Sequence, residues 1–170
     1  TRKGIDTMME GSFEETGGQA SIASVTDRVR PVAIETSVMS VHCLDDRAVF
    51  VGGEEIVAMV DRQGALSKVG VHSGGILCAA SDGARIVMGG DDGKLVSLDA
   101  MGEVRVLATD AKRRWIDTVA VHPDGAVAWS VGKTAFVRSG KGEEKSLDVP
   151  STVGGLAFAP KGLRLAVSHY

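Results

Sequence analysis

The sequence predicts an all-β protein assembled from short antiparallel strands. From residue 25 onward, β-branched or aliphatic runs alternate with turns that contain Gly, Asp or Pro. Glycine accounts for 22 of the 170 residues, about twice its usual share of ~7%. No window keeps the apolar spacing of an amphipathic helix over three turns. The candidate strands are residues 32–35, 38–44, 48–51, 56–61, 66–69, 76–80, 85–88, 95–99, 104–108, 118–122, 127–130, 134–138, 145–149, 155–159 and 164–168.

Composition and charge exclude several classes of protein. The chain is 44% hydrophobic and 24% charged, which indicates a folded domain rather than a disordered chain, and its apolar runs are too short to span a membrane. A net charge of -3 gives no strong basic field, so neither nucleic acid nor a bilayer is a favoured partner. Residues 1–24 lack periodicity and predict a mobile N-terminal arm ahead of a folded region at 25–170. Without a secretory signal in that arm, we expect a cytoplasmic protein.

A repeated unit decides the architecture. Four turn-centred segments align: LDDRAVFVGG, SDGARIVMGG, PDGAVAWSVG and PKGLRLAVSH. Their equivalent positions Asp46, Gly83, Gly125 and Gly162 are spaced by 37, 42 and 37 residues, close to the period of a four-stranded propeller blade. The sequence therefore predicts a β-propeller segment of about three and a half four-stranded antiparallel blades. The blades are expected at about 38–70, 76–109, 118–150 and 155–170.

The ring that these blades predict is incomplete. Propellers close with ~4–8 blades, so we expect the chain to be the N-terminal part of a longer protein or one part of an assembly. The remaining blades of the same protein, or a second copy, would complete the ring. The strand expected at 32–35 precedes the first blade and has no sheet of its own to complete.

The repeats resemble the WD-repeat family of β-propellers over roughly residues 32–170. The best unit is VHSGGILCAASDGARIVMGGDDGKLVSLD, residues 71–99. There His72 stands at the His of the family's Gly-His pair, Asp92 in the turn between the second and third strands, and Asp99 at the Asp of the Trp-Asp ending. In the family, that His and turn Asp join a Ser or Thr and the Trp in a hydrogen-bonded network.

The other repeats match this signature in part. Met88 and Leu98 replace the Ser or Thr and the Trp of the best unit, so the resemblance implies an incomplete network. Asp61 is retained in the first unit, whereas the third has Arg138 at that point. The pair Asp124-Gly125 matches the family's Pro-Asp-Gly turn.

No catalytic or metal-binding constellation emerges from the sequence. The four His residues occupy different phases of the repeat and lack zinc-site spacing, so we expect no metal and no cofactor. The starts of the inner strands, where propeller enzymes gather ligands, carry mostly small residues here. The alternative is a propeller enzyme, hydrolase- or lactonase-like, whose axial metal ligands lie largely outside this sequence.

The run Lys112-Arg113-Arg114-Trp115 is the candidate partner-binding element. It falls in the loop between the second and third blades, on the face that members of the family use for binding. Arg and Trp are common anchors of protein interfaces, and a cationic cluster suits an acidic peptide. In the competing interpretation, Trp115 packs under its own loop with an Arg stacked on it. We therefore expect a non-catalytic interaction scaffold whose partner is a protein or peptide, with an acidic one as a candidate.

Overall fold

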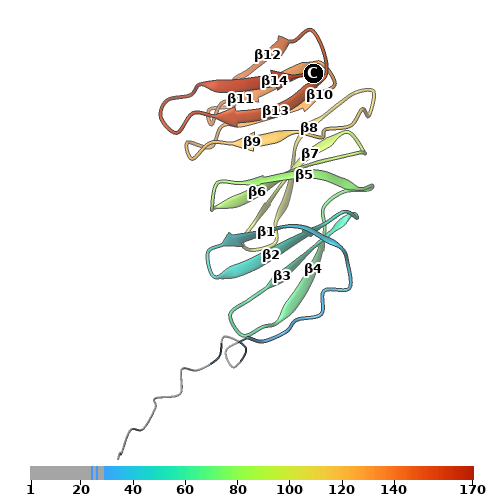
Figure 1. Cartoon of the computed structure of the whole chain (residues 1–170), viewed down its shortest axis with the longest axis vertical. Coiled ribbons are helices and arrows are strands. Elements are labelled where there is room, and N and C mark those ends of the chain that lie inside the picture. Colours follow the sequence, from blue (N-terminus) through green and yellow to red (C-terminus); the bar gives the residue numbers. More distant parts are fainter. Residues whose placement is uncertain (1–23, 25, 27–28) are drawn as a thin grey trace, which may run out of the picture. The chain divides into compact units, whose positions relative to one another are not determined.

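The computed structural model describes residues 24, 26 and 29–170, and the chain divides into two units, Thr1–Pro31 and Val32–Tyr170. The predicted N-terminal arm at 1–24 lies outside the described residues except for residue 24. The fourteen strands found among the described residues all belong to the second unit. They form three four-stranded meanders and one two-stranded hairpin, which follow one another along the chain (Figure 1).

Each sheet is antiparallel, with its strands in chain order. Blade 1 comprises β1 (Val38–Leu44), β2 (Arg47–Gly52), β3 (Ile56–Val60) and β4 (Leu66–Gly70). Blade 2 comprises β5 (Ile76–Ser81), β6 (Arg85–Gly90), β7 (Lys94–Asp99) and β8 (Val104–Thr109). Blade 3 comprises β9 (Val119–Val121), β10 (Val127–Val131), β11 (Thr134–Arg138) and β12 (Glu144–Asp148), and half-blade 4 comprises β13 (Val153–Phe158) and β14 (Leu165–His169).

The sheets converge at their first strands. Strand β9 contacts both β5 and β13, whereas no comparable contact joins the outermost strands β4, β8 and β12 in the part of the chain that the structure describes. Sheets that meet at the inner edge and separate at the outer edge are arranged as propeller blades. The prediction of an all-β propeller segment with three and a half blades is therefore confirmed. Completion of the ring stays a prediction.

A bulge recurs at the same place in three blades. The register shifts between Val38 and Ser40 in β1, between Ile76 and Cys78 in β5, and in the same way near the start of β13. A bulge inserts one extra residue and increases the local twist. Its recurrence at the start of the inner strand shows that the blades repeat in backbone detail as well as in sequence.

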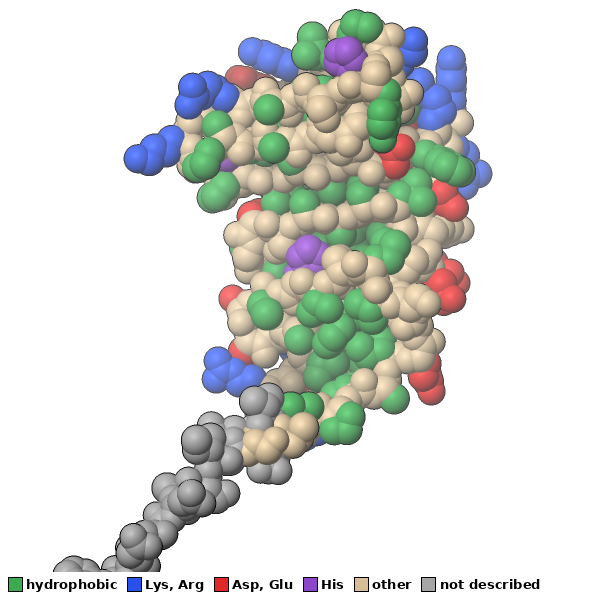
Figure 2. Space-filling view, viewed as in Figure 1, with side chains coloured by type: hydrophobic (Ala, Val, Ile, Leu, Met, Phe, Trp, Pro, Cys, Tyr) green, Lys and Arg blue, Asp and Glu red, His purple; other side chains and the backbone are tan. Residues whose placement is uncertain are grey.

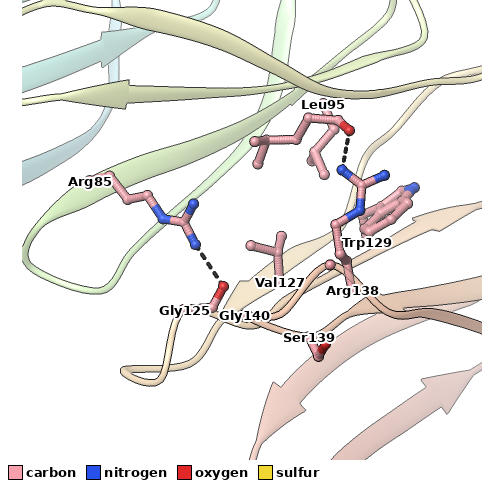
Figure 3. A pocket seen from close by; sticks show the side chains of 10 residues that line it. Arg85, Leu95, Gly125, Val127, Trp129, Arg138, Ser139 and Gly140 are labelled. Carbon is pink, nitrogen blue, oxygen red and sulfur yellow. Dashed lines mark hydrogen bonds between the residues drawn. The ribbon is translucent and has the colours of Figure 1, made fainter.

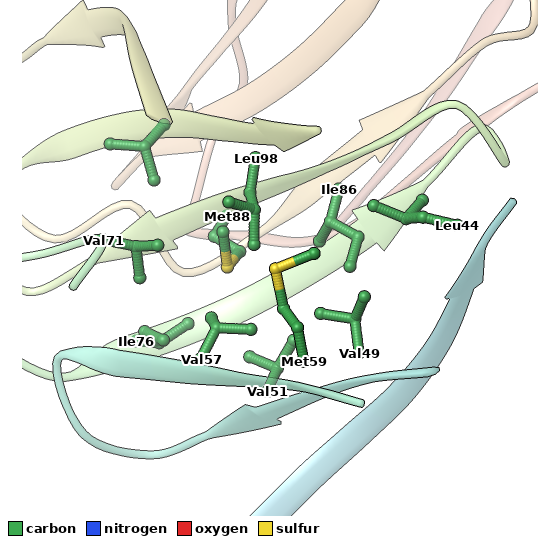
Figure 4. Packing of buried hydrophobic residues seen from close by; sticks show 11 residues of the cluster. Leu44, Val49, Val51, Val57, Met59, Val71, Ile76, Ile86, Met88 and Leu98 are labelled. Carbon is green, nitrogen blue, oxygen red and sulfur yellow. The ribbon is translucent and has the colours of Figure 1, made fainter. Parts of the chain in front are cut away.

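Blade 2 is apolar on both faces. Ile86 and Met88 of β6 point into the core shared with blade 1 (Figure 4), and Val87 between them points into the core shared with blade 3. All three are fully buried. Because alternate side chains of a strand face opposite sides, one continuous apolar run fills both interfaces.

The prediction of a strand at 32–35 is wrong. In the structure this segment pairs with no strand of the described residues. Glu35 takes a left-handed conformation, φ 60°, which extended strands do not accommodate. The Glu35 carboxylate instead accepts a hydrogen bond from Lys68 Nζ of β4 at 3.0 Å. The segment thus lies against blade 1 as irregular chain.

Candidate interaction surface

The loop of residues 110–116, between β8 and β9, is organised by one carboxylate. Asp110 opens the loop, and its backbone N–H donates to the Gly93 carbonyl at 2.8 Å. Its carboxylate accepts the backbone N–H groups of Lys112 and Arg114, both at 3.0 Å, and the Arg114 guanidinium at 2.7 Å. The Arg114 guanidinium and these backbone donors lower the pKa of Asp110 to about 2. The Asp110 carboxylate is therefore fully charged at neutral pH.

The other end of the 110–116 loop is fixed by burial. Ile116 donates its backbone N–H to the Gly90 carbonyl at 3.1 Å, and its side chain is fully buried in the core between blades 2 and 3. Arg113 has a left-handed backbone, φ 52°. Its Cα lies so near Gly93 that a Cβ on that glycine would be 2.6 Å away. The loop thus rests closely on the β6–β7 turn.

The predicted cluster lies on the surface of this fixed loop. Lys112, Arg113, Arg114 and Trp115 are all exposed, and Trp115 keeps 62% of its surface accessible. The interpretation that Trp115 packs under its own loop is wrong, because its neighbour Ile116 occupies the buried position instead. Arg114 is paired with Asp110. Lys112 and Arg113 form no ion pair with the described residues.

A groove between blades 2 and 3 lies beside the loop, and Arg138 lines both of its pockets. Figure 3 shows the smaller of the two. The Arg138 guanidinium lies 5.6 Å from the Trp129 ring centroid, donates to the Leu107 carbonyl of β8 and pairs with Glu144 at 2.8 Å. On one side of it is a pocket of about 160 Å³. On the other side, next to the 110–116 loop, is a pocket of about 290 Å³.

Sequence reasoning missed this groove. Arg138 was noted only as a departure from the Asp of the repeat ending, and Trp129 as part of a strand. The structure stacks Trp129 on Phe136 with ring centroids 5.4 Å apart, beneath Arg138. An Arg at the place of the repeat Asp, one strand after a Trp, was the available signal, because Arg readily stacks on Trp.

The structure brings His72 and Asp92 together, as the resemblance implies. His72 Nδ1 lies 3.0 Å from Asp92 Oδ1, and Asp92 Oδ2 accepts the backbone N–H and hydroxyl of Ser73 at 3.0 and 3.1 Å. Met88, at the place of the family's Ser or Thr, packs in the core. His72 Nε2 is buried without a partner among the described residues. This network stabilises the turn.

The pKa of Asp92 reflects two opposing effects. Desolvation by burial raises it, while hydrogen bonds from the Ser73 backbone, His72 and the Lys94 backbone lower it. The hydrogen bonds prevail, so the pKa lies well below its usual value. Asp92 is a charged structural anchor at neutral pH.

The remaining signature residues stabilise turns. Asp61 Oδ1 accepts the Ala65 N–H at 2.8 Å, and Asp99 Oδ1 accepts the N–H groups of Met101 and Glu103, both at 2.9 Å.

The turn between β9 and β10 also joins two blades. The backbone N–H of Asp124 donates to His122 Nδ1 at 3.2 Å. Gly125, with φ 84°, accepts Arg85 Nη2 of blade 2 through its carbonyl at 2.8 Å (Figure 3).

No three His, Cys, Asp or Glu side chains within the described residues lie close enough together to hold a metal ion. The described residues also include no helix with the length and apolar character to cross a membrane.

Comparisons with known proteins support the fold. No family model matches the chain, and no curated protein matches it. Among solved structures, a chain in the crystal structure of the mitotic checkpoint complex matches with a TM-score of 0.63 at 18% sequence identity. The match covers 78% of this chain and 46% of that one, so the chain spans less than half the length of the matched chain. This likeness supports a WD40-like β-propeller as the fold.

Proposed function

We propose that the chain is a non-catalytic protein-interaction scaffold and that the 110–116 loop binds an acidic peptide segment of its partner. The observation that carries the proposal is a fixed loop with an exposed Trp115 and two cations, Lys112 and Arg113, that form no ion pair with the described residues. An exposed aromatic ring beside an Arg is the composition that interface anchors favour.

The rigidity of the loop supports this function. Asp110 holds one end, and the buried Ile116 side chain holds the other. A preformed loop loses little conformational entropy on binding, so more of the contact energy contributes to affinity. Lys112 and Arg113 have no ion pair with the described part of the chain that would have to break before they meet the partner.

Charge across the molecule favours the same partner. In the view of Figure 2, Lys and Arg side chains gather over blade 3 and half-blade 4, and most visible Asp and Glu side chains lie lower. An uneven field steers an anionic segment toward the cationic side and raises its association rate.

The test is binding to an array of short synthetic peptides of graded acidic content. We expect retention to rise with acidic content, and the variant Lys112→Glu/Arg113→Glu to bind at least about tenfold more weakly. The control Lys141→Glu/Lys161→Glu makes the same change in net charge on exposed residues of other turns. Equal losses in both variants, or no dependence on acidic content, would overturn the proposal.

A further inference from the structure

The larger pocket of the interblade groove opens directly beside the 110–116 loop. Its volume is about 290 Å³. Asp110 and Ala111 line this pocket, and Asp110 is also the residue that latches Lys112 and Arg114 into place. The proposed binding loop and the pocket are therefore one continuous surface.

Apolar side chains form part of the wall of the pocket, together with the polar side chains of Thr109, Asp110, Arg138 and Glu144. Ala108 and Ala111 contribute one side, Val131 and Phe136 the other, and Trp129 stacks on Phe136 between them. A dry apolar cavity of ~150 Å³ is large enough to hold benzene, so a Leu or Phe side chain fits within the space available. Burial of such a side chain would anchor a peptide.

The rim of the pocket is compatible with an acidic peptide. Its two carboxylates, Asp110 and Glu144, are each paired with an arginine, at 2.7 and 2.8 Å. Neither therefore presents an uncompensated negative charge to an incoming peptide. Lys112 and Arg113, one and two residues beyond Ala111, leave the local balance positive.

Arg138 closes the far end of the pocket. Its guanidinium reaches from β11 to the Leu107 carbonyl of β8 and lies over Trp129. The smaller pocket behind it, about 160 Å³, is separated from the loop by this side chain.

We propose that the bound segment is an extended acidic peptide carrying one apolar or aromatic side chain, which enters the pocket beneath Ala111 while flanking carboxylates meet Lys112 and Arg113. The inference rests on the proposed function and adds to it the specificity for a mixed acidic and apolar motif.

The experiment selects binders from a displayed library of random short peptides with the full chain as bait. We expect enriched peptides to combine acidic residues with one apolar residue at a fixed position. Thr109→Trp places a bulky side chain at the pocket, which Thr109 lines from an exposed position. It should weaken the best peptide by about tenfold or more, as should replacing the peptide's apolar residue with Ala.

The matched control is Val106→Trp. Val106 lies on the same strand, is 58% exposed and lines neither pocket, so affinity should change by less than about twofold. Ala111→Trp provides a second obstruction of the pocket should Thr109→Trp disturb the fold. Near-UV circular dichroism of each variant verifies folding.

The outcomes separate the two proposals. Enriched acidic peptides without a fixed apolar position, sensitive to Lys112→Glu/Arg113→Glu but not to Thr109→Trp or Ala111→Trp, would overturn the pocket inference and leave the proposed function standing. No enrichment, or binding insensitive to all these variants, would overturn both.

Discussion

The imidazole of His72 and the carboxylate of Asp92 form a buried pair, with Nδ1 and Oδ1 separated by 3.0 Å. Their side chains are 0% and 3% exposed. They join the loop that enters blade 2 to the turn between β6 and β7, the turn against which Arg113 rests. Through the β6–β7 turn, the pair thus supports the surface proposed to bind a partner.

Asp92→Asn should lower the free energy of unfolding by about 1–3 kcal/mol at pH 7, because it leaves buried donors without their charged acceptor. Asp91→Asn is the control, since the Asp91 carboxylate accepts no hydrogen bond from any residue that the structure describes. The pKa of Asp92 is lowered in the fold, so its stabilisation is present above the unfolded value of 3.8 and lost as pH falls through the folded pKa. Urea unfolding at pH 7 and pH 3 measures both effects, and an undiminished difference at pH 3 would contradict this account.

Trp115→Ala and Ile116→Ala should separate binding from stability. Trp115 is 62% exposed, so its truncation should change the unfolding free energy by less than about 0.5 kcal/mol while weakening acidic-peptide binding. Ile116 is fully buried, so Ile116→Ala should cost about 2–5 kcal/mol. Denaturant unfolding beside peptide titration tests this contrast, and a strongly destabilised Trp115→Ala variant would refute it.

Gly93→Ala should destabilise the chain more than Gly83→Ala. Both glycines have positive φ, 74° and 89°, so both substitutions carry a conformational cost of about 1–2 kcal/mol. Only Gly93 is crowded, since its added Cβ would meet the Arg113 backbone at 2.6 Å, whereas Gly83 has nothing within 4 Å. Thermal unfolding of the two variants isolates the contact with the loop. Equal melting temperatures would show that the 110–116 loop can move away from the added Cβ without loss of stability.

The two cysteines should differ in reactivity. Burial raises the pKa of Cys78 to about 12, and its thiol donates to the Ile116 carbonyl at 3.4 Å, whereas Cys43 is exposed. Iodoacetamide at pH 8 should label Cys43 in the folded chain and Cys78 only after unfolding. Mass spectrometry of tryptic peptides distinguishes the sites, with Cys43→Ser as control.

The raised pKa of Cys78 also affects the stability of the fold at alkaline pH. Because the folded pKa of Cys78 lies above its usual 9.0, the unfolded chain loses this proton first. Its contribution to stability is complete below pH 9.0 and decreases as pH rises toward 12. Rapid labelling of Cys78 in the native state would contradict the burial.

The blades were predictable because strand alternation and turn residues are local signals. Gly83, Gly125 and Gly162 mark equivalent turns and all adopt positive φ, which the residue type alone favours. The prediction of a strand at 32–35 was wrong because a strand needs a neighbouring strand to pair with, and no local sequence signal reports whether such a strand is in reach. The β-branched residues there matched the pattern without forming a sheet.

The candidate surface was predictable only in part. The cationic run and Trp115 stood out by composition. That Ile116 is buried while Trp115 is exposed could not be predicted, because an irregular loop has no periodicity that indicates which side chains face the core. The groove joins Leu107 and Arg138, which lie in different blades. Such contacts depend on the spacing between sheets, which one sequence does not report.

The 110–116 loop is hydrogen-bonded to a turn of blade 2 at Gly93, and the Ile116 side chain packs in the core between blades 2 and 3. The orientation of the loop consequently depends on the angle between the two sheets as well as on its own residues Asp110 and Ile116. Grafting the seven residues onto a foreign scaffold would transfer the side chains without their presentation. Conversely, the affinity of a molecule that contacts both blade 2 and blade 3 would depend on the angle between these two sheets.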